Sequence, residues 1–171
     1  MKGLIIYKGK YGATRQYGLW LGDALGWPVI PAGSETTQQL LNADCIILGS
    51  SIYIGKLQLR KWLKQQENLI ISKRLFLFLV SGTPLSDKEK LQGYLDANIS
   101  KPLRNRCQCF FLPGKLEFSK LSWKDKLLLT IGSKLAGAKS DDISMEDYND
   151  VKKEHLETIL NAVGKLREVN V

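Results

Sequence analysis

The sequence has few of the residues that build metal centres and disulfide frameworks. Among its 171 residues are three cysteines and one histidine, and no Cys-x-x-Cys pair occurs. A structural zinc site needs several Cys or His ligands at close spacing, so the sequence argues against one. Cys107 and Cys109 would share one face of a strand, as packed thiols, and the odd number of cysteines favours a reducing compartment. We therefore predict a cytoplasmic protein without a bound metal.

Long hydrophobic runs are also missing. No stretch reaches the ~18 consecutive apolar residues of a membrane-spanning helix. The first apolar run, at 4–7, is too short for a signal peptide. Hydrophobic residues make up 44% of the chain and charged residues 25%, which is typical of a globular protein. The length predicts a single domain over residues 1–171.

Acidic residues are in deficit. Lysine and arginine number 25 against 17 aspartates and glutamates, which gives a net charge of +8. A basic surface favours an anionic partner: nucleic acid, an acidic membrane surface or an anionic small molecule. Nucleic acid is the least favoured of the three, because the sequence has no recognised nucleic-acid motif and no aromatic-basic platform.

Short apolar runs alternate with amphipathic stretches along the chain. The runs predict five strands, at 4–7, 27–30, 44–49, 75–80 and 107–112. A first helix is predicted to end at Leu25, with Gly26 as its C-cap. Further helices are predicted at 34–41, 57–69, 86–99 and 145–168. Ser34, Ser86 and Ser144 are their expected N-caps. This alternation predicts an α/β protein with a parallel sheet covered by helices on both faces. Pro28 predicts that the second strand starts there or lies at an edge.

The segment between the fifth strand and the last helix does not fit the alternation. Leu121, Leu128, Ile131 and Leu135 recur at helical spacing, and lysines lie around them. We predict an inserted basic amphipathic helix over residues 119–139. Such a helix either contacts an acidic membrane surface or packs on the sheet as an ordinary solvated helix.

A glycine-bearing loop follows the first strand, where an open parallel sheet binds ligands. It consists of Lys8, Gly9, Lys10, Tyr11, Gly12, Ala13 and Thr14. Glycines let backbone N–H groups turn toward an anion, and a hydroxyl at a helix start can add a donor. The loop is neither a Walker loop nor a dinucleotide fingerprint. It is either a phosphate site or an ordinary glycine turn with a threonine cap.

Gly12 and Thr14 resemble the phosphate loop of the flavodoxin family, in which Lys8 here replaces a hydroxyl residue. The run Gly49-Ser50-Ser51-Ile52-Tyr53-Ile54-Gly55 resembles a loop of the branch that contains menaquinone-dependent protoporphyrinogen dehydrogenases. The long segment from Pro113 resembles that branch as well. The resemblance implies a three-layer sandwich with a five-stranded parallel sheet in the order 2-1-3-4-5.

The resemblance also implies FMN as the cofactor. The second loop would border the flavin ring through Ser50, Ser51, Ile52, Tyr53 and Gly55. The third loop would face the ring from the other side through Ser81, Gly82 and Thr83. Without a flavin, Tyr53 would be a surface aromatic residue and the third loop a plain turn.

Two functions remain open from the sequence. One is an enzyme of the protoporphyrinogen dehydrogenase type, which passes electrons to a quinone at the inner face of a membrane. The other is a soluble electron carrier that docks on partner redox proteins. Positive charge at Lys8, Lys10, Arg15 and Lys56 favours the enzyme, because it would stabilise the reduced, anionic flavin. No catalytic side chain is predicted, since the flavin would perform the redox chemistry. His155, in the last predicted helix, is expected to be a surface or packing residue.

Overall fold

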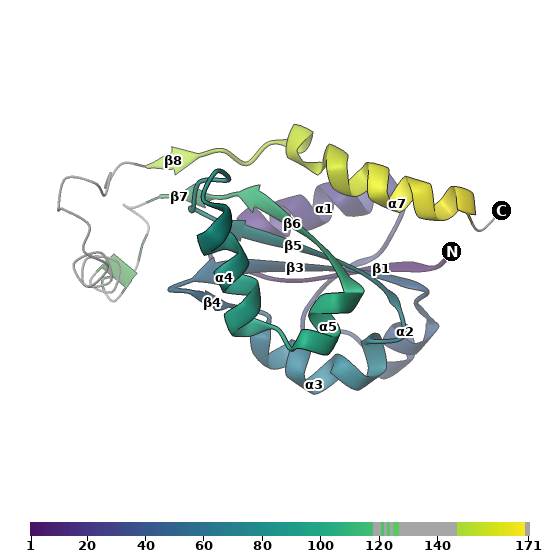
Figure 1. The fold of residues 1–171 in the computed structure, drawn as a ribbon. Helices are drawn as coiled ribbons and strands as arrows, with labels where there is room; N and C mark the ends of the chain where they lie inside the picture. Colours follow the sequence, from purple (N-terminus) through teal and green to yellow (C-terminus); the bar gives the residue numbers. More distant parts are fainter. Residues whose placement is uncertain (118–120, 122, 124, 127–146, 170–171) are drawn as a thin grey trace.

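Five parallel strands form the centre of the molecule. A computed structural model describes residues 1–117, 121, 123, 125, 126 and 147–169. The strands are β1 (Gly3–Lys8), β2 (Val29–Pro31), β3 (Cys45–Tyr53), β5 (Arg74–Ser81) and β6 (Cys107–Pro113). Their order is β2-β1-β3-β5-β6 (Figure 1). This arrangement confirms the predicted flavodoxin-like parallel order, and it also confirms that the short second strand, which follows Pro28, lies at an edge.

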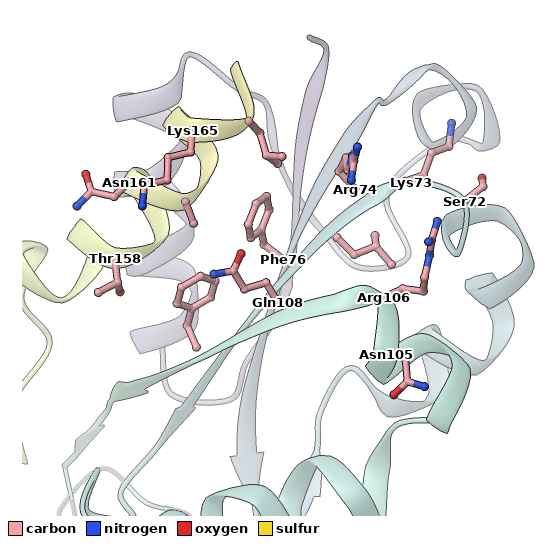
Figure 2. Close-up of a pocket in the computed structure, with 14 residues that line it drawn as sticks. Ser72, Lys73, Arg74, Phe76, Asn105, Arg106, Gln108, Thr158, Asn161 and Lys165 are labelled. Carbon is pink, nitrogen blue, oxygen red and sulfur yellow. The ribbon is translucent and has the colours of Figure 1, made fainter. Parts of the chain in front are cut away.

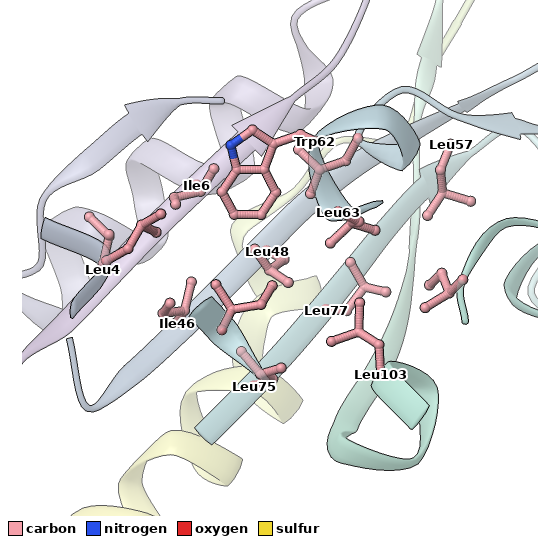
Figure 3. Close-up of a cluster of buried hydrophobic side chains, with 14 of the residues drawn as sticks. Leu4, Ile6, Ile46, Leu48, Leu57, Trp62, Leu63, Leu75, Leu77 and Leu103 are labelled. Atoms are coloured by element: carbon pink, nitrogen blue, oxygen red, sulfur yellow. The ribbon is translucent and has the colours of Figure 1, made fainter. Parts of the chain in front are cut away.

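Helices cover both faces of the sheet (Figure 1). α1 (Ala13–Leu25) and α7 (Glu157–Val169) contribute to one hydrophobic cluster, with Tyr17 and Phe78 at its centre. The second cluster includes residues of α2 (Thr37–Asn42), α3 (Arg60–Ile70), α4 (Lys88–Asn98) and α5 (Lys101–Arg106). Figure 3 shows leucines and isoleucines of this cluster together with Trp62. Because strand side chains alternate between faces, β1 gives Ile5 to the first cluster and its neighbours Leu4 and Ile6 to the second.

The third strand is longer than the sequence predicts. Residues 50–53, expected in a loop, continue β3, and β4 (Lys56–Leu57) returns antiparallel beside the last two of them. Ile54 and Gly55 form the two-residue turn with φ of 48° and 68°, which is typical of tight hairpin turns. Because residues 56–57 are used in this hairpin, α3 begins at Arg60 rather than near Leu57.

Several predicted helix starts are wrong by a few residues. Thr36, not Ser34, caps α2, and it forms a reciprocal capping box with Gln39. Asp87, not Ser86, caps α4 by accepting a hydrogen bond from the Lys90 N–H. In both cases the observed cap lies one or two residues after the predicted serine. A capping side chain must reach the N–H groups of the first helical turn, and in each helix it is the later residue that does so. The predicted Gly26 C-cap is confirmed, with φ of 68° and an N–H donated to the Gly22 carbonyl.

The last helix starts later than predicted. Residues Tyr148–Asn149 form β8, which pairs antiparallel with β7 (Lys115–Leu116). A 3₁₀ turn over Lys153–Leu156 follows, and α7 begins at Glu157. The strand pairing requires extended backbone at residues 148 and 149, so these two residues are not part of the last helix as predicted. The predicted cap Ser144 lies outside the described residues.

The inserted helix predicted over 119–139 lies mostly outside the described residues. Within that range the structure describes residues 121, 123, 125 and 126, of which the last three are helical. Leu121 and Asp125 are buried there, and Trp123 is exposed. Among the described helices, none is long and apolar enough to cross a membrane.

Candidate functional site

A cavity of about 530 Å³ lies at the carboxyl edge of the sheet. It lies beside the point where the strand order reverses, since β1 has β2 on one side and β3 on the other. Open α/β sheets bind their ligands at this position. Three loops and the β7–β8 pair supply its lining, which consists of Lys10, Tyr11, Ala13, Thr14, Ser51, Ile52, Tyr53, Ile54, Val80, Ser81, Gly82, Gly114, Lys115, Leu116 and Tyr148.

The structure brings most of the predicted site residues together in this cavity. All three predicted loops contribute, through Lys10, Tyr11, Ala13, Thr14, Ser51, Ile52, Tyr53, Ser81 and Gly82. The other predicted residues do not line it, although they belong to the same three predicted segments; they are Lys8, Gly9, Gly12, Ser50, Gly55 and Thr83.

Two hydroxyl groups in the cavity wall have no partner within the described part of the chain. The Oγ1 of Thr14 and the Oγ of Ser51 are both buried and form no hydrogen bond there. Thr14 does not cap α1, because Gly12 occupies the N-cap position and no side chain makes a cap hydrogen bond. A buried hydroxyl without a partner is energetically costly, so these two hydroxyls indicate that the cavity binds a polar ligand.

Glycines allow the first loop to close tightly around Thr14. A Cβ at Gly9 would lie 2.5 Å from the Thr14 hydroxyl oxygen, so no larger residue fits there without a shift. Gly12 has a φ of 85°, which L side chains rarely adopt. The loop therefore brings its backbone close to the position that a ligand of Thr14 would occupy.

Two predicted residues have structural partners instead of facing the cavity. The Ser50 hydroxyl accepts a hydrogen bond from the Leu59 N–H and donates one to the Ser51 carbonyl, both at 3.1 Å. The Thr83 and Tyr94 hydroxyls share a hydrogen bond of 3.0 Å. These contacts fix the second and third loops to the segments that follow them.

A buried carboxylate next to the cavity was not foreseen from the sequence. Asp125 accepts hydrogen bonds from the Lys10 ammonium at 2.6 Å, from the Tyr11 hydroxyl at 2.7 Å and from the Tyr53 hydroxyl. The Lys10 ammonium also lies 3.7 Å from the centre of the Tyr53 ring. The inserted segment thereby contacts both the first and the second loop.

These contacts change the acid–base behaviour of the cluster. Burial alone would lower the pKa of Lys10, but its hydrogen bonds with Asp125 and Tyr53 hold that pKa above its usual value. Burial, and then the hydrogen bond to Asp125, raises the pKa of Tyr11 to about 12 and also raises that of Tyr53. At neutral pH the lysine of the cluster is therefore cationic and both phenols are protonated.

The far wall of the cavity was also not predicted from the sequence. Gly114, Lys115, Leu116 and Tyr148 line it. Lys115 and Leu116 belong to β7, and Tyr148 comes from β8, so the strand pair holds this wall in place. A glycine and a lysine directly after the fifth parallel strand are the signal that could have indicated it.

A second, larger cavity of about 1190 Å³ lies at the opposite end of the sheet (Figure 2). Its lining comes mainly from the start of β5, the start of β6 and α7. Lys73, Arg74, Arg106 and Lys165 line it, and no acidic residue does so among the described residues. None of the predicted site residues lies there. We therefore place the candidate site at the carboxyl edge, where Thr14 and Ser51, which carry the two unpartnered hydroxyls, line the cavity.

A doubly wound parallel sheet with a ligand-sized cavity at its switch point defines an open α/β binding protein. A family model described as the flavodoxin domain matches residues 4–142. The chain belongs to this flavodoxin-domain family. No curated protein matches the sequence.

Solved structures with a similar chain trace include flavodoxins. One is a flavodoxin from the domain Archaea, with 18% identity, a TM-score of 0.44, and 80% of this chain and 97% of that chain covered. Another is oxidised flavodoxin 2 from Bacillus cereus, with 16% identity, a TM-score of 0.45, and coverage of 80% and 99%. A third is a flavoprotein from Lactobacillus acidophilus in complex with FMN, with 13% identity, a TM-score of 0.44, and coverage of 66% and 91%.

Proposed function

We propose that this chain is a flavoprotein that binds one FMN at the carboxyl edge of its sheet. The observation that carries the proposal is the pair of buried, unpartnered hydroxyls of Thr14 and Ser51 in the cavity wall. A phosphate beside Thr14 would accept a hydrogen bond from its hydroxyl. It would also accept hydrogen bonds from the backbone N–H groups of the loop and of the first turn of α1. The Ser51 hydroxyl would meet a polar edge of the flavin.

The remaining cavity wall suits a flat, partly apolar ring system. Ile52 and the ring of Tyr53 offer apolar and aromatic surface. When bound, FMN would supply the redox chemistry. The residues of this chain would bind its phosphate, orient its ring and limit the access of water.

Flavin titrations test this proposal. Thr14→Val keeps the shape of the side chain but removes the hydroxyl, so we expect FMN affinity to fall by about tenfold or more, in line with ~1.5–3 kcal/mol for a hydrogen bond to a charged group. Thr37→Val is the matched control, because Thr37 is exposed at the start of α2 and does not line the cavity. If the wild type binds no FMN, the cofactor proposal is wrong; equal affinities for wild type and Thr14→Val would remove Thr14 from the site.

For the reaction, we propose an oxidoreductase that acts on an apolar partner, such as a quinone acceptor and a protoporphyrinogen-type donor. Exposed apolar side chains support this choice. Ile54 and Tyr148 line the cavity and remain 48% and 37% exposed. Trp123, two residues before Asp125, is 70% exposed. Apolar surface beside a ligand cavity is typical of a binding site for an apolar compound.

The alternative is an electron carrier that docks on redox proteins, and a redox titration separates the two. The net charge of +8 should stabilise reduced, anionic flavin. We therefore expect a potential for the second electron less negative than that of acidic flavodoxins. A potential as low as theirs would favour the carrier.

We also propose that residues 119–139 make peripheral contact with an acidic membrane. Their lysines and apolar residues in the sequence support this, although most of the range lies outside the described residues. Wild type should float with anionic vesicles at low salt, and changing Lys120, Lys124 and Lys126 to Gln should weaken the binding. A wild type that stays out of the vesicle fraction would refute this contact.

A further inference from the structure

Two lysines line the proposed FMN cavity, and their partners differ. Lys10 contacts Asp125 at 2.6 Å, and the Asp125 side chain is only 7% exposed. Lys115 contacts Glu117 at 3.4 Å, and the Glu117 side chain is 33% exposed. A short pair with a buried carboxylate is held far more firmly than a long pair with a solvated one. Lys10 is therefore the less available cation, although it lies in the predicted phosphate loop.

The partners of Asp125 explain why Lys10 is held so firmly. One carboxylate oxygen accepts hydrogen bonds from the Lys10 ammonium and the Tyr53 hydroxyl, and the other accepts one from the Tyr11 hydroxyl. The Tyr53 ring lies directly beside the same ammonium. Moving Lys10 toward a ligand phosphate would break this short pair with a buried carboxylate, which is strongly unfavourable.

The side chain of Lys115 reaches the predicted phosphate loop from β7. Lys115 belongs to β7, whose pairing with β8 holds its backbone in register. A Cβ at Gly12 would lie 4.0 Å from the Cε of Lys115, so the end of this side chain lies close to the turn that starts α1. Thr14, with its unpartnered hydroxyl, is in the first turn of the same helix.

We propose that Lys115, and not Lys10, supplies the positive charge that binds the FMN phosphate. Asp125 is then a positioning residue that neutralises Lys10 and fixes the Tyr53 ring at the cavity wall. This inference rests on the proposed function and assigns its phosphate and ring contacts to particular residues. The phosphate would replace Glu117 as the partner of Lys115.

Comparing FMN with riboflavin, which lacks the phosphate, isolates the role of Lys115. Lys115→Gln should lower FMN affinity about tenfold or more and leave riboflavin affinity unchanged. Lys90→Gln is the matched control, because Lys90 is exposed on α4 and does not line the cavity, and neither affinity should change. If Lys115→Gln leaves FMN affinity unchanged, or lowers both affinities equally, the assignment of Lys115 is wrong.

The ratio of FMN affinity to riboflavin affinity also tests the role of Asp125. Asp125→Asn should raise the preference for FMN over riboflavin, because Lys10 loses its counter-charge, and should weaken riboflavin binding, because Tyr53 loses its acceptor. The double variant Lys10→Gln/Asp125→Asn removes both charges, so its preference should equal that of the wild type, and it provides the test should Asp125→Asn fail to fold. A preference in the double variant that falls as far as in Lys115→Gln would show that Lys10 binds the phosphate.

Inorganic phosphate separates a failure of this inference from a failure of the proposed function. A wild type that binds neither flavin would refute the FMN proposal. Phosphate binding to the flavin-free chain, measured by calorimetry, should still be weaker in Lys115→Gln than in the wild type and in Lys90→Gln. Equal phosphate binding by all three, or none by the wild type, would overturn the assignment of Lys115.

Discussion

Ile54 is the residue of the site with the least favourable backbone conformation. It is the only residue other than glycine with a positive φ among the described residues, and at 48° this conformation is rarely adopted by a β-branched side chain. Ile54 is 48% exposed, so packing offsets only part of the strain. Strain at the rim of a ligand cavity is often retained for function, here as apolar surface beside the proposed flavin.

Replacing Ile54 by asparagine should therefore stabilise the protein. Asparagine tolerates the left-handed region and is favoured in such hairpin turns, so we expect a gain of about 1 kcal/mol in the free energy of unfolding. Ile54→Val is the control, because valine is also β-branched and should keep the strain. Urea unfolding measures both variants, and an asparagine variant no more stable than the valine variant would show that the turn is not strained.

Cys107 and Cys109 predict how stability depends on alkaline pH. Burial raises the pKa of Cys107 from 9.0 to about 12 and that of Cys109 to about 11. Above pH 9 the unfolded chain loses thiol protons that the folded chain retains, so the free energy of unfolding falls as the pH rises toward 11. In melting experiments from pH 8 to 11, the variant with both residues changed to alanine should show a shallower fall than the wild type. Parallel curves would mean that the two thiols titrate alike in both states.

At the scale of elements, the β3–β4 hairpin depends on close packing and on one buried amide. Asn98, at the end of α4, accepts a hydrogen bond from the Leu57 N–H and donates one to the Gly55 carbonyl. Helix α4 thus holds the turn that presents Ile54 at the cavity. Earlier in β3, Gly49 lies so close to the Phe78 ring that a Cβ at this position would clash with the ring.

Two identical substitutions in different elements should have opposite effects. Gly49→Ala forces the Phe78 ring to move in a fully packed cluster, which should destabilise the protein by ~1–3 kcal/mol. Gly93→Ala, within α4, places a Cβ in open space and should stabilise it by ~0.5–1 kcal/mol, because alanine favours helix. Thermal melting of both variants checks the signs, and a loss in both would mean that the space around Gly93 is filled in solution.

The elements differ in how well the sequence predicts them. The central strands were predicted well, because β3 and β5 read as unbroken apolar runs when both faces are covered. The continuation of β3 through Ser50 and Ser51 was missed, since these residues pair with β1 and β5, and the next two, Ile52 and Tyr53, pair with β4. The late start of the last helix depends likewise on the pairing of β7 with β8. Local signals do not contain such long-range pairings.

The residues of the candidate site likewise differ in how well the sequence predicts them. Thr14 and Gly12 were assigned from a local loop, and Thr14 lines the cavity beside the turn that Gly12 allows. The role of Lys10 was assigned from its charge alone, without its partner Asp125, which is 115 residues away. A residue's charge can be read from the sequence, but whether that charge is free for a ligand depends on the fold.

At the scale of the whole molecule, the two ends of the sheet differ in chemistry. The carboxyl end has buried hydroxyls, aromatic rings and an internally neutralised lysine. The other end has an open cavity with cationic side chains (Figure 2). A flavin needs the hydroxyls and the apolar wall, so it should choose the first cavity, although the second is lined by more cationic side chains.

Mapping FMN binding on the backbone amides by NMR tests the central claim most directly. We predict saturation at one FMN per chain, with the largest shifts at residues 9–14, 51–55 and 81–83 and none at Arg74, Arg106 or Lys165. The same map with inorganic phosphate should keep the shifts at 9–14 and lose those at 51–55. Shifts confined to the cationic cavity, or no saturable shifts, would contradict the account.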